Sequence, residues 1–487
     1  MSNHSLSLEA AAPPTGRLLG VTEHSWCRAL AGGTGTTAVA ILASKAPDAS
    51  LLQTALHKIQ AAHAILRSKI RHPSTGASAA AALSFVTPAI PSLQIKLFDL
   101  SSTSRLLHRL SIPNNLSLPS FRLVLEHELN QPTWSDPGRS SCNAEYCDCE
   151  LMFASVYELP ESKWAVVLRF HTAACDRTTA ASLLRELLGL MRGGGGTGRE
   201  TGGEGEVSLG IEDLIPKGKG SKGLWARGVD MLGYSLNSLR LTNLKFKDMK
   251  SSRSSEMVRL RMCPHDTARV LAGCKSRGIK LCGALAAAGL IAADSYKRRR
   301  KDHQRKKHYY GVVTFTDCRP NLHPPLSPHH FGFYHSAILN QHAIKGGEQL
   351  WDLAGKSYDA FATSKKENKH FSDMADLNFL MCKAIENPSL TPSSSLRTSF
   401  VSVFEDPVVD EGDAYGELGV EDYVGCASVH GVGPSIALFD TVRGGGLDCA
   451  CVYPAPLHSR EQMQELVDVM KTLLVEAGKC AEISEIY

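Results

Sequence analysis

The chain has 487 residues, of which 43% are hydrophobic, and 53 Lys and Arg stand against 49 Asp and Glu. This composition is typical of a globular protein of two or three domains. The net charge of +4 is too small to indicate nucleic acid or a membrane surface as a partner. The sequence contains no apolar run of 18 residues, no secretory signal pattern and no lipidation motif, so we expect a cytoplasmic protein without a membrane span.

The first 16 residues are polar and contain prolines, and we expect them to be disordered. An N-terminal domain is predicted over residues 17–192. Its first clear elements are a strand at GGTGTTAVAILAS and a helix that begins at PDASLL, capped by Asp48 or Ser50. Leucine, isoleucine and alanine recur at helical spacing along that helix and predict one buried face.

Strands are predicted over residues 79–98 and 151–170, and WAVVLRF is apolar enough to be buried on both faces of a sheet. The stretch TTAASLLRELLGLM then predicts an amphipathic helix. It ends at GGGGTGRETGGEGE, residues 193–206, whose glycines favour a flexible loop. Residues 193–254 as a whole are predicted to cross from the first domain to the second.

The second domain is predicted over residues 255–487 and has a similar makeup of strands and helices. Its elements are a strand at SSEMVRLRM, a small-residue helix at CGALAAAGLIAADSY, strands at YYGVVTFTDCRP, FVSVFEDP and SIALFDTV, and a final helix at REQMQELVDVMKTLLVEAG. The basic run at 297–307 fits a solvated loop. A nuclear-import signal or a phosphate-binding patch is the alternative, so nuclear localisation stays open beside the cytoplasm.

The 14 cysteines are expected to be reduced thiols, many of them buried. Cys142, Cys147 and Cys149 do not have the spacing of a standard zinc site, and no metal is predicted. Cys449 and Cys451 lie in an alternating apolar run that a buried strand explains.

The segment HTAACDR, from His171 to Arg177, stands between a buried strand and a helix. Acyl transfer to an alcohol or an amine requires a base that takes the proton of the attacking group. An imidazole suits this role because its ordinary pKa, about 6.5, is close to the working pH.

Three segments in this order resemble one superfamily over roughly residues 17–480. HAILRSKI resembles "H-P-x-L-R-x-x-[FI]", HTAACDR resembles "HHxxxDG", and GVVTFTDCRPNLHPPL with HFGFYHSAI resembles "D-x-R…L-P-P…F-G-N". The superfamily contains chloramphenicol acetyltransferase, the plant BAHD acyltransferases and the condensation domains of nonribosomal peptide synthetases. Within it, the chain looks most similar to plant condensation-domain-like proteins.

The resemblance implies an α/β fold of two chloramphenicol-acetyltransferase-like domains, with mixed sheets flanked by helices and a tunnel between them. It implies small-molecule substrates: an acyl donor, most often an acyl-CoA thioester that acts as a co-substrate, and an acceptor. No bound cofactor is implied, and a monomer is expected.

The motif departs from the family pattern at two positions. Thr172 stands where the second, basic histidine belongs, and His171 corresponds to the first histidine. Arg177 replaces the glycine that follows the aspartate. The resemblance further implies that Asp176 forms an ion pair with Arg67 inside the first domain.

Each candidate has a functional and a structural interpretation. His171 is either a displaced base or a packed histidine, and Thr172 can orient a water or an acceptor but cannot act as a base. His335, on the predicted channel wall beside His329 and His330, is either a substitute imidazole or a structural residue. Arg177 either narrows or blocks the channel or binds an anion.

Cys175 stands among small residues, and buried packing suits it better than a role as nucleophile. Two functions therefore follow. The first is an acyltransferase that moves an acyl group from a thioester to a hydroxyl or amine with an altered catalytic centre. The second is a catalytically impaired relative that binds a metabolite or a protein.

Overall fold

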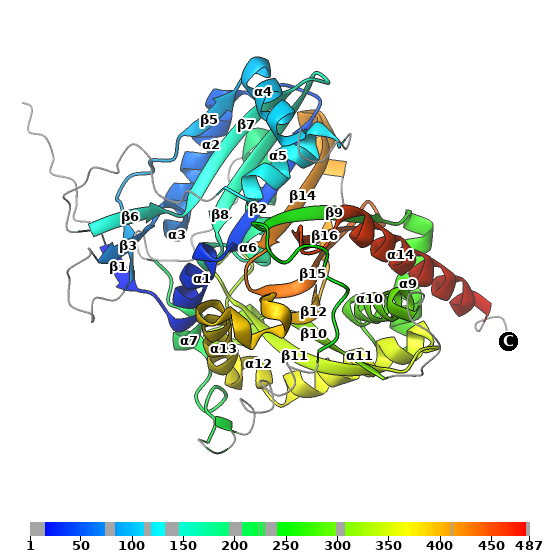
Figure 1. Cartoon of the computed structure of the whole chain (residues 1–487). Coiled ribbons are helices and arrows are strands. Elements are labelled where there is room, and N and C mark those ends of the chain that lie inside the picture. Colours follow the sequence, from blue (N-terminus) through cyan, green and yellow to red (C-terminus); the bar gives the residue numbers. More distant parts are fainter. Residues whose placement is uncertain are drawn as a thin grey trace, which may run out of the picture.

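The fold was analysed in a computed structural model of the chain (Figure 1). It describes residues 15–73, 83–111, 118–131, 146–193, 207–223, 225, 227–228, 241–298, 307–410 and 413–483. The glycine-rich loop expected at 193–206 and the basic run at 297–307 lie almost wholly outside these residues, and so does the stretch 1–14.

A five-stranded sheet forms the centre of the first lobe. Its order is β14 (Val420–Val429), β2 (Thr34–Ala43), β8 (Lys163–His171), β7 (Met152–Leu159) and β5 (Ile95–Phe98), and only β5 and β7 run parallel. The apolar run in β8 is buried because helices cover both faces of the sheet. One face packs on α2 (Ala49–Ala62) and α6 (Arg177–Met191), and the other on α4 (Leu100–Ser111) and α5 (Ser120–Leu129).

The predicted start of α2 is confirmed at Asp48. Its carboxylate accepts hydrogen bonds from the backbone N–H of Ser50 at 2.9 Å and of Leu51 at 3.0 Å. These contacts satisfy two of the amides that a helix leaves free in its first turn. Leu52, Ala55, Leu56 and Ile59 form the buried face, as their spacing predicts.

A small four-stranded sheet lies at the edge of the first lobe, in the order β1 (Thr15–Leu18), β4 (Ser84–Thr87), β3 (Lys69–Pro73) and β6 (Tyr146–Glu150). The short helices α1 (Val21–Ala31) and α3 (Ala64–Arg67) belong to the same lobe. Because β1 begins at Thr15, the last two residues of the stretch expected to be disordered lie in a strand. Cys147 and Cys149 lie in β6, and no group of metal-ligating residues occurs within the described ranges.

The second lobe is built on a seven-stranded mixed sheet. Its order is β11 (His335–Ile344), β10 (His308–Asp317), β12 (Arg397–Phe404), β15 (Gly433–Arg443), β16 (Gly446–Ala455) and β9 (Ser254–Arg261), and β13 (Val408–Asp410) pairs with β15. The predicted strands of this half are therefore confirmed. Both lobes have the mixed sheets that the resemblance implies.

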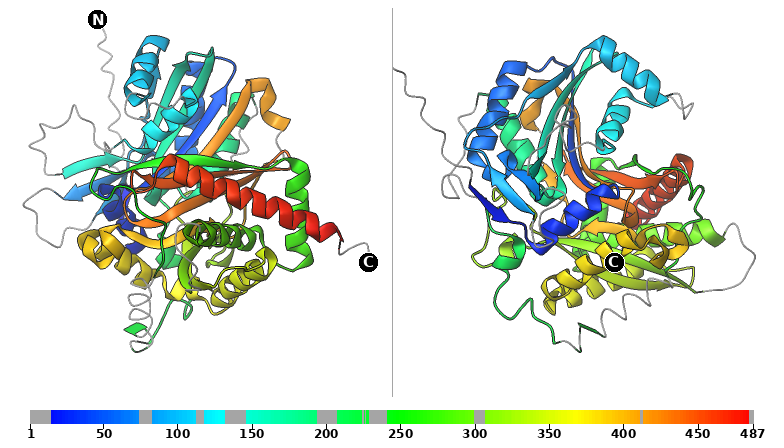
Figure 2. Two further views of the ribbon diagram at one scale, coloured as in Figure 1. Left: turned by 45° about the vertical axis from the view of Figure 1, so that its right-hand side comes forward. Right: turned by 60° about the vertical axis from the view of Figure 1, so that its left-hand side comes forward.

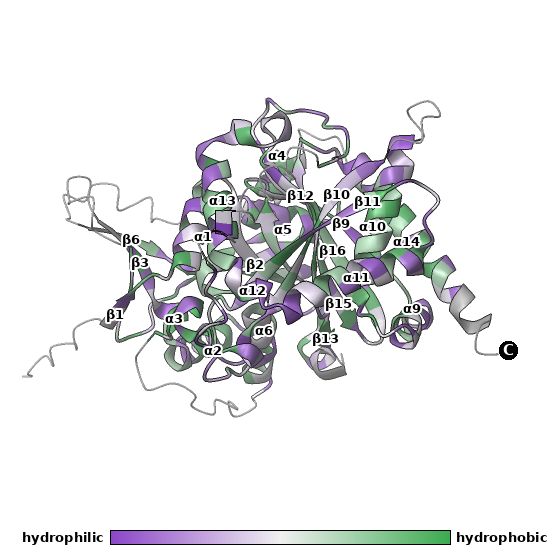
Figure 3. Ribbon diagram, turned by 90° about the horizontal axis from the view of Figure 1, so that it is seen from below, coloured by the Kyte–Doolittle hydropathy of each residue, from purple (hydrophilic) through white to green (hydrophobic). Residues whose placement is uncertain are grey.

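Four long helices pack on the second sheet and form its core: α9 (Pro264–Ser276), α10 (Leu281–Arg298), α11 (Leu350–Lys366) and α14 (Arg460–Ile483). Figure 2 shows α14 lying across this lobe beside α10. The small residues of α10 allow close packing, since a Cβ added at Gly283 would stand 2.9 Å from the Ala354 carbonyl oxygen. The apolar character of α10 and of the central strands is visible in Figure 3.

Shorter helices join these elements: α7 (Ile211–Leu214), α12 (Lys369–Ser372) and α13 (Met374–Glu386). No single helix in the described ranges is long and apolar enough to cross a bilayer. Only α9 and α10 taken together reach that threshold, and they are bent by 106° against each other.

One strand of the second half lies in the sheet of the first lobe. β14 pairs antiparallel with β2 along nearly its whole length, from Val420 opposite Ala43 to Val429 opposite Thr34. The orange strand beside the blue one in Figure 1 shows this exchange. A single boundary near residue 255 therefore does not separate the two lobes, because residues 420–429 return to the first.

Candidate active site

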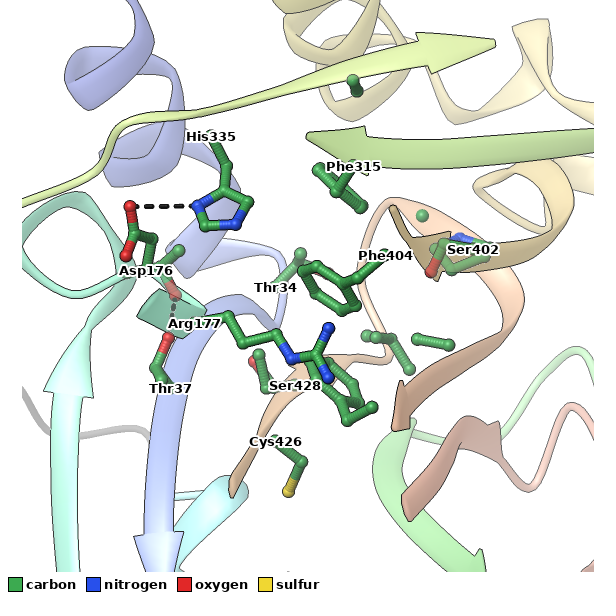
Figure 4. A pocket seen from close by; sticks show the side chains of 18 of the residues that line it. Thr34, Thr37, Asp176, Arg177, Phe315, His335, Ser402, Phe404, Cys426 and Ser428 are labelled. Carbon is green, nitrogen blue, oxygen red and sulfur yellow. Dashed lines mark hydrogen bonds and ion pairs between the residues drawn. The ribbon is translucent and has the colours of Figure 1, made fainter. Parts of the chain in front are cut away.

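A cavity of about 450 Å³ lies between the two lobes. The first lobe lines it with β2, β14, the turn after β8 and the start of α6, and the second with β10, β11, β12 and β15. Most side chains in its wall are apolar, among them Val39, Leu184, Phe315, Leu339 and Phe404. Thr172, Asp176, Arg177 and His335 also line it, as Figure 4 shows for the last three.

Asp176 is the residue from which α6 begins. Its Oδ1 accepts a hydrogen bond from the backbone N–H of Thr179 at 2.8 Å, which caps the helix. Its Oδ2 accepts another from the N–H of Tyr334 at 2.8 Å, and the Asp176 N–H donates to the Gly332 carbonyl at 3.2 Å. These contacts join the start of α6 to the loop before β11, so the two lobes meet at this carboxylate.

Arg319 is the cation that neutralises Asp176. Its guanidinium contacts both carboxylate oxygens, at 2.9 Å and 3.1 Å, and the side chains of both residues are only 1% exposed. Arg319 also contacts Asp317 at 3.0 Å. Burial alone would raise the pKa of Asp176, but the charge of Arg319, together with His335 and the hydrogen bonds, holds it well below its usual range. Asp176 is therefore a carboxylate that accepts hydrogen bonds and donates none.

The prediction that Arg67 forms an ion pair with Asp176 is wrong. Arg67 instead donates to the carbonyl oxygens of Gln60 at 2.9 Å, Ala61 at 3.0 Å and Pro88 at 3.0 Å. The first two are carbonyls at the end of α2, where a helix leaves its acceptors free. Arg67, in α3, thus caps the end of the preceding helix α2, and the partner of Asp176 comes from the other lobe.

His335 is the first residue of β11 and lies against Asp176. Its Nδ1 is 3.0 Å from Asp176 Oδ2, although the N–H direction is not aligned well enough for a straight hydrogen bond. Phe404 meets its ring edge to face, with ring centres 5.9 Å apart. Figure 4 shows the opposite edge of the imidazole turned toward the cavity.

Adjacent residues of the turn after β8 point to different sides. His171 is 1% exposed, its Nδ1 accepts from the N–H of Ala173 at 3.1 Å, and it is not among the residues that line the cavity. Thr172 lines the cavity, with its Oγ1 2.9 Å from that of Thr37. Thr37 also donates to the Cys175 carbonyl at 3.0 Å.

Cys175 is fully buried, and burial raises the pKa of its thiol well above the usual value. A thiol in this state is a weak nucleophile. His329 and His330 do not line the cavity, and His330 packs edge to face on Tyr334 instead.

Arg177 extends across the cavity wall from α6 to the second lobe. It pairs with Asp440 at 3.0 Å and with that residue's carbonyl, donates to the Asp406 carbonyl at 3.1 Å, and lies 4.2 Å above the Phe404 ring. Its charge is already neutralised by Asp440, whose side chain is 1% exposed. Of the roles considered for Arg177, narrowing of the channel fits this geometry better than binding of an anionic substrate.

Solved structures with the same architecture cover nearly the whole chain. Polyketide synthase associated protein 5 from Mycobacterium tuberculosis is 17% identical, with 95% of this chain and 97% of that one covered (TM-score 0.59). The first condensation domain of the calcium-dependent antibiotic synthetase is 13% identical, with 96% and 97% covered (TM-score 0.59). The EpoB cyclization-docking bidomain from Sorangium cellulosum is 13% identical, with 97% and 87% covered (TM-score 0.63).

No protein-family model matches the sequence, and no curated protein sequence matches it. At these low identities the structural likeness establishes the fold. The chain has the two-lobed, chloramphenicol-acetyltransferase-like fold of condensation domains, as expected from the sequence. The closer resemblance to plant proteins and to BAHD enzymes stays a prediction.

Sequence reasoning missed Arg319 as the partner of Asp176. The signal was present, because Arg319 is the arginine of the "D-x-R" segment that supports the resemblance. Its role depends on how the two lobes dock, and motif spacing within one half does not reveal that.

Proposed function

We propose that this protein transfers an acyl group from a thioester, such as an acyl-CoA, to a hydroxyl or an amine. The observation that supports this function is the cavity between the lobes, whose wall carries the turn after β8, the Asp176 carboxylate and one imidazole. A thioester is already activated toward attack, so the protein has to hold two substrates together and remove one proton.

The character of the wall favours apolar substrates. Phe315, Leu339, Leu377, Met381 and Phe404 line the cavity, and the cation closest to its centre in Figure 4, Arg177, is paired with Asp440. Burying an aliphatic chain there would contribute roughly 0.8 kcal/mol for each methylene group removed from water. We therefore expect medium or long acyl groups to be transferred faster than acetyl.

The test measures release of free CoA by the purified full chain. Acetyl-, octanoyl- and palmitoyl-CoA are each offered with n-octanol or n-hexylamine, and the acylated product is identified by mass spectrometry. CoA release that requires the acceptor, and yields the expected ester or amide, would support the function. No product from any pair would count against it.

Gly425 offers a matched control for the cavity. It lines the cavity from β14, and a Cβ added there meets no atom within 4 Å. We expect Gly425→Phe to fill the cavity and lower the rate at least tenfold, while Gly425→Ala keeps wild-type activity. Both variants should unfold at temperatures close to that of the wild type, since neither changes a packed contact.

The alternative function is a non-catalytic binding module for a metabolite. Two observations favour it: Thr172 occupies the usual place of the base, and Arg177 narrows the cavity. Binding of octanoyl-CoA, followed by calorimetry, without product from any acceptor would support this alternative. Gly425→Phe should abolish that binding as well.

A further inference from the structure

The proposed acyl transfer requires a base at the cavity, and the motif position that would supply an imidazole holds Thr172. His171 does not reach the cavity. Among the described residues that line it, His335 is the one histidine. It comes from the second lobe, whereas the carboxylate beside it, Asp176, comes from the first.

We propose that His335 is the general base of this protein, held by Asp176 across the interface between the lobes. This inference rests on the proposed acyl transfer. It assigns the proton-removing step to a residue outside the HTAACDR segment and gives that segment the task of orienting the ring.

The ionised Asp176 carboxylate favours one tautomer of His335. Because Asp176 can only accept, we assign the hydrogen to Nδ1, which faces it at 3.0 Å. The neutral ring then has its lone pair on Nε2. Among the described residues, none forms a hydrogen bond or ion pair with Nε2, and this edge of the ring faces the cavity in Figure 4.

The same carboxylate stabilises the ring once it has taken a proton. The His335 side chain is only 6% exposed, and its Nδ1 lies at ion-pair distance from Asp176. Arg319 keeps Asp176 ionised and in place. The wall also carries Arg177, which pairs with Asp440, and the charged residues Arg185, Lys383, Arg397 and Asp410.

Thr172 retains a role as an acceptor of hydrogen bonds. The Cys175 carbonyl can only accept, so Thr37 donates to it and Thr172 donates to Thr37. The free lone pairs of the Thr172 oxygen are left for an incoming group. An acceptor hydroxyl or amine can hydrogen-bond there before it reacts.

The reaction balances with these groups alone. Nε2 of His335 takes the proton from the acceptor as its oxygen or nitrogen attacks the thioester carbonyl carbon. The tetrahedral intermediate collapses, the carbon–sulfur bond breaks, and the leaving thiolate takes the proton from Nε2. The products are an ester or amide and free thiol, and His335 is neutral again.

His335→Asn is the informative variant, because its amide N–H₂ can occupy the place of Nδ1 beside Asp176 while nothing replaces Nε2. We expect the kcat for octanoyl transfer to fall by about 10²–10⁴, with KM and the unfolding temperature close to wild type. The acid limb of the pH profile of kcat/KM should disappear. Thr172→His in the His335→Asn background should restore part of the rate, and Thr172→Val alone should reduce it less than His335→Asn.

The outcomes separate this assignment from the function. If the wild type forms no product, the proposed function fails and His335 has no reaction to serve. If the wild type is active and His335→Asn retains its rate within threefold, the function stands and His335 is not the base. Unfolding of both His335→Asn and His335→Gln would make His335 a structural residue and overturn the assignment.

Discussion

Removing Arg319 should destabilise the protein more than removing any exposed arginine. In Arg319→Met the Asp176 carboxylate stays buried, with a 1% exposed side chain, and keeps only two amides and His335 as partners. Leaving one member of a buried pair uncompensated typically costs about 3–5 kcal/mol. We expect this loss in the free energy of unfolding, measured at pH 7 by guanidinium titration of the full chain.

A double-mutant cycle isolates the pair. Asp176→Asn removes the charge, so Arg319→Met in that background should cost less, with a coupling energy of about 1–3 kcal/mol. Arg67→Met is the control, because Arg67 contacts three carbonyls and no carboxylate. Its effect should add to that of Asp176→Asn within about 0.5 kcal/mol. Strong coupling of Asp176 to Arg67 and none to Arg319 would refute the reasoning.

Three further predictions concern the surroundings of the site. Arg177→Gly should widen the cavity toward longer acyl-CoAs and, by leaving Asp440 unpaired, lower the free energy of unfolding by on the order of 3 kcal/mol; an unchanged chain-length profile would contradict it. Gly332→Ala should lower stability by about 1–3 kcal/mol, because Gly332 has φ +149° and a Cβ would stand 2.7 Å from the Tyr334 ring; calorimetry of this variant would test the strain. Burial, reinforced by Arg397, lowers the pKa of His458 to about 3. Below about pH 6.5, His458 therefore binds a proton in the unfolded chain but stays neutral in the folded chain. The free energy of unfolding should fall with decreasing pH by up to about 1.4 kcal/mol per pH unit. Denaturant titrations at pH 7 and pH 5 should show a smaller difference in His458→Gln.

Local patterns predicted the elements well because each has a local physical cause. The run in β8 is apolar on both faces, and α2 begins at Asp48, whose side chain caps the two following amides. No local pattern indicates that β14, from the second half of the chain, joins the sheet of the first lobe. Alternating residues indicate a strand but not the sheet that it joins, and pairing with β2 depends on how the two halves dock.

In the site, too, the sequence predicts the local features but not those that depend on how the two lobes dock. The turn from His171 to Arg177 was found from its motif, and the Thr172 substitution is plain in the sequence. The pairing of Asp176 was mispredicted because Arg67 instead donates to carbonyls at the end of the preceding helix, α2. The true partner and the candidate base both come from the other lobe, so neither follows from residues near the motif.

The position of β14 also bears on how the protein is made. β2, β7 and β8 leave the ribosome before β14, and the edge of β2 stays unpaired until residues 420–429 have been synthesised. At about 5–20 residues per second, that wait is on the order of tens of seconds. During it, the nascent first lobe exposes an open strand edge of the kind that recruits other chains. The first lobe is thus completed only after most of the second lobe has been synthesised, because β14 follows those strands in the sequence.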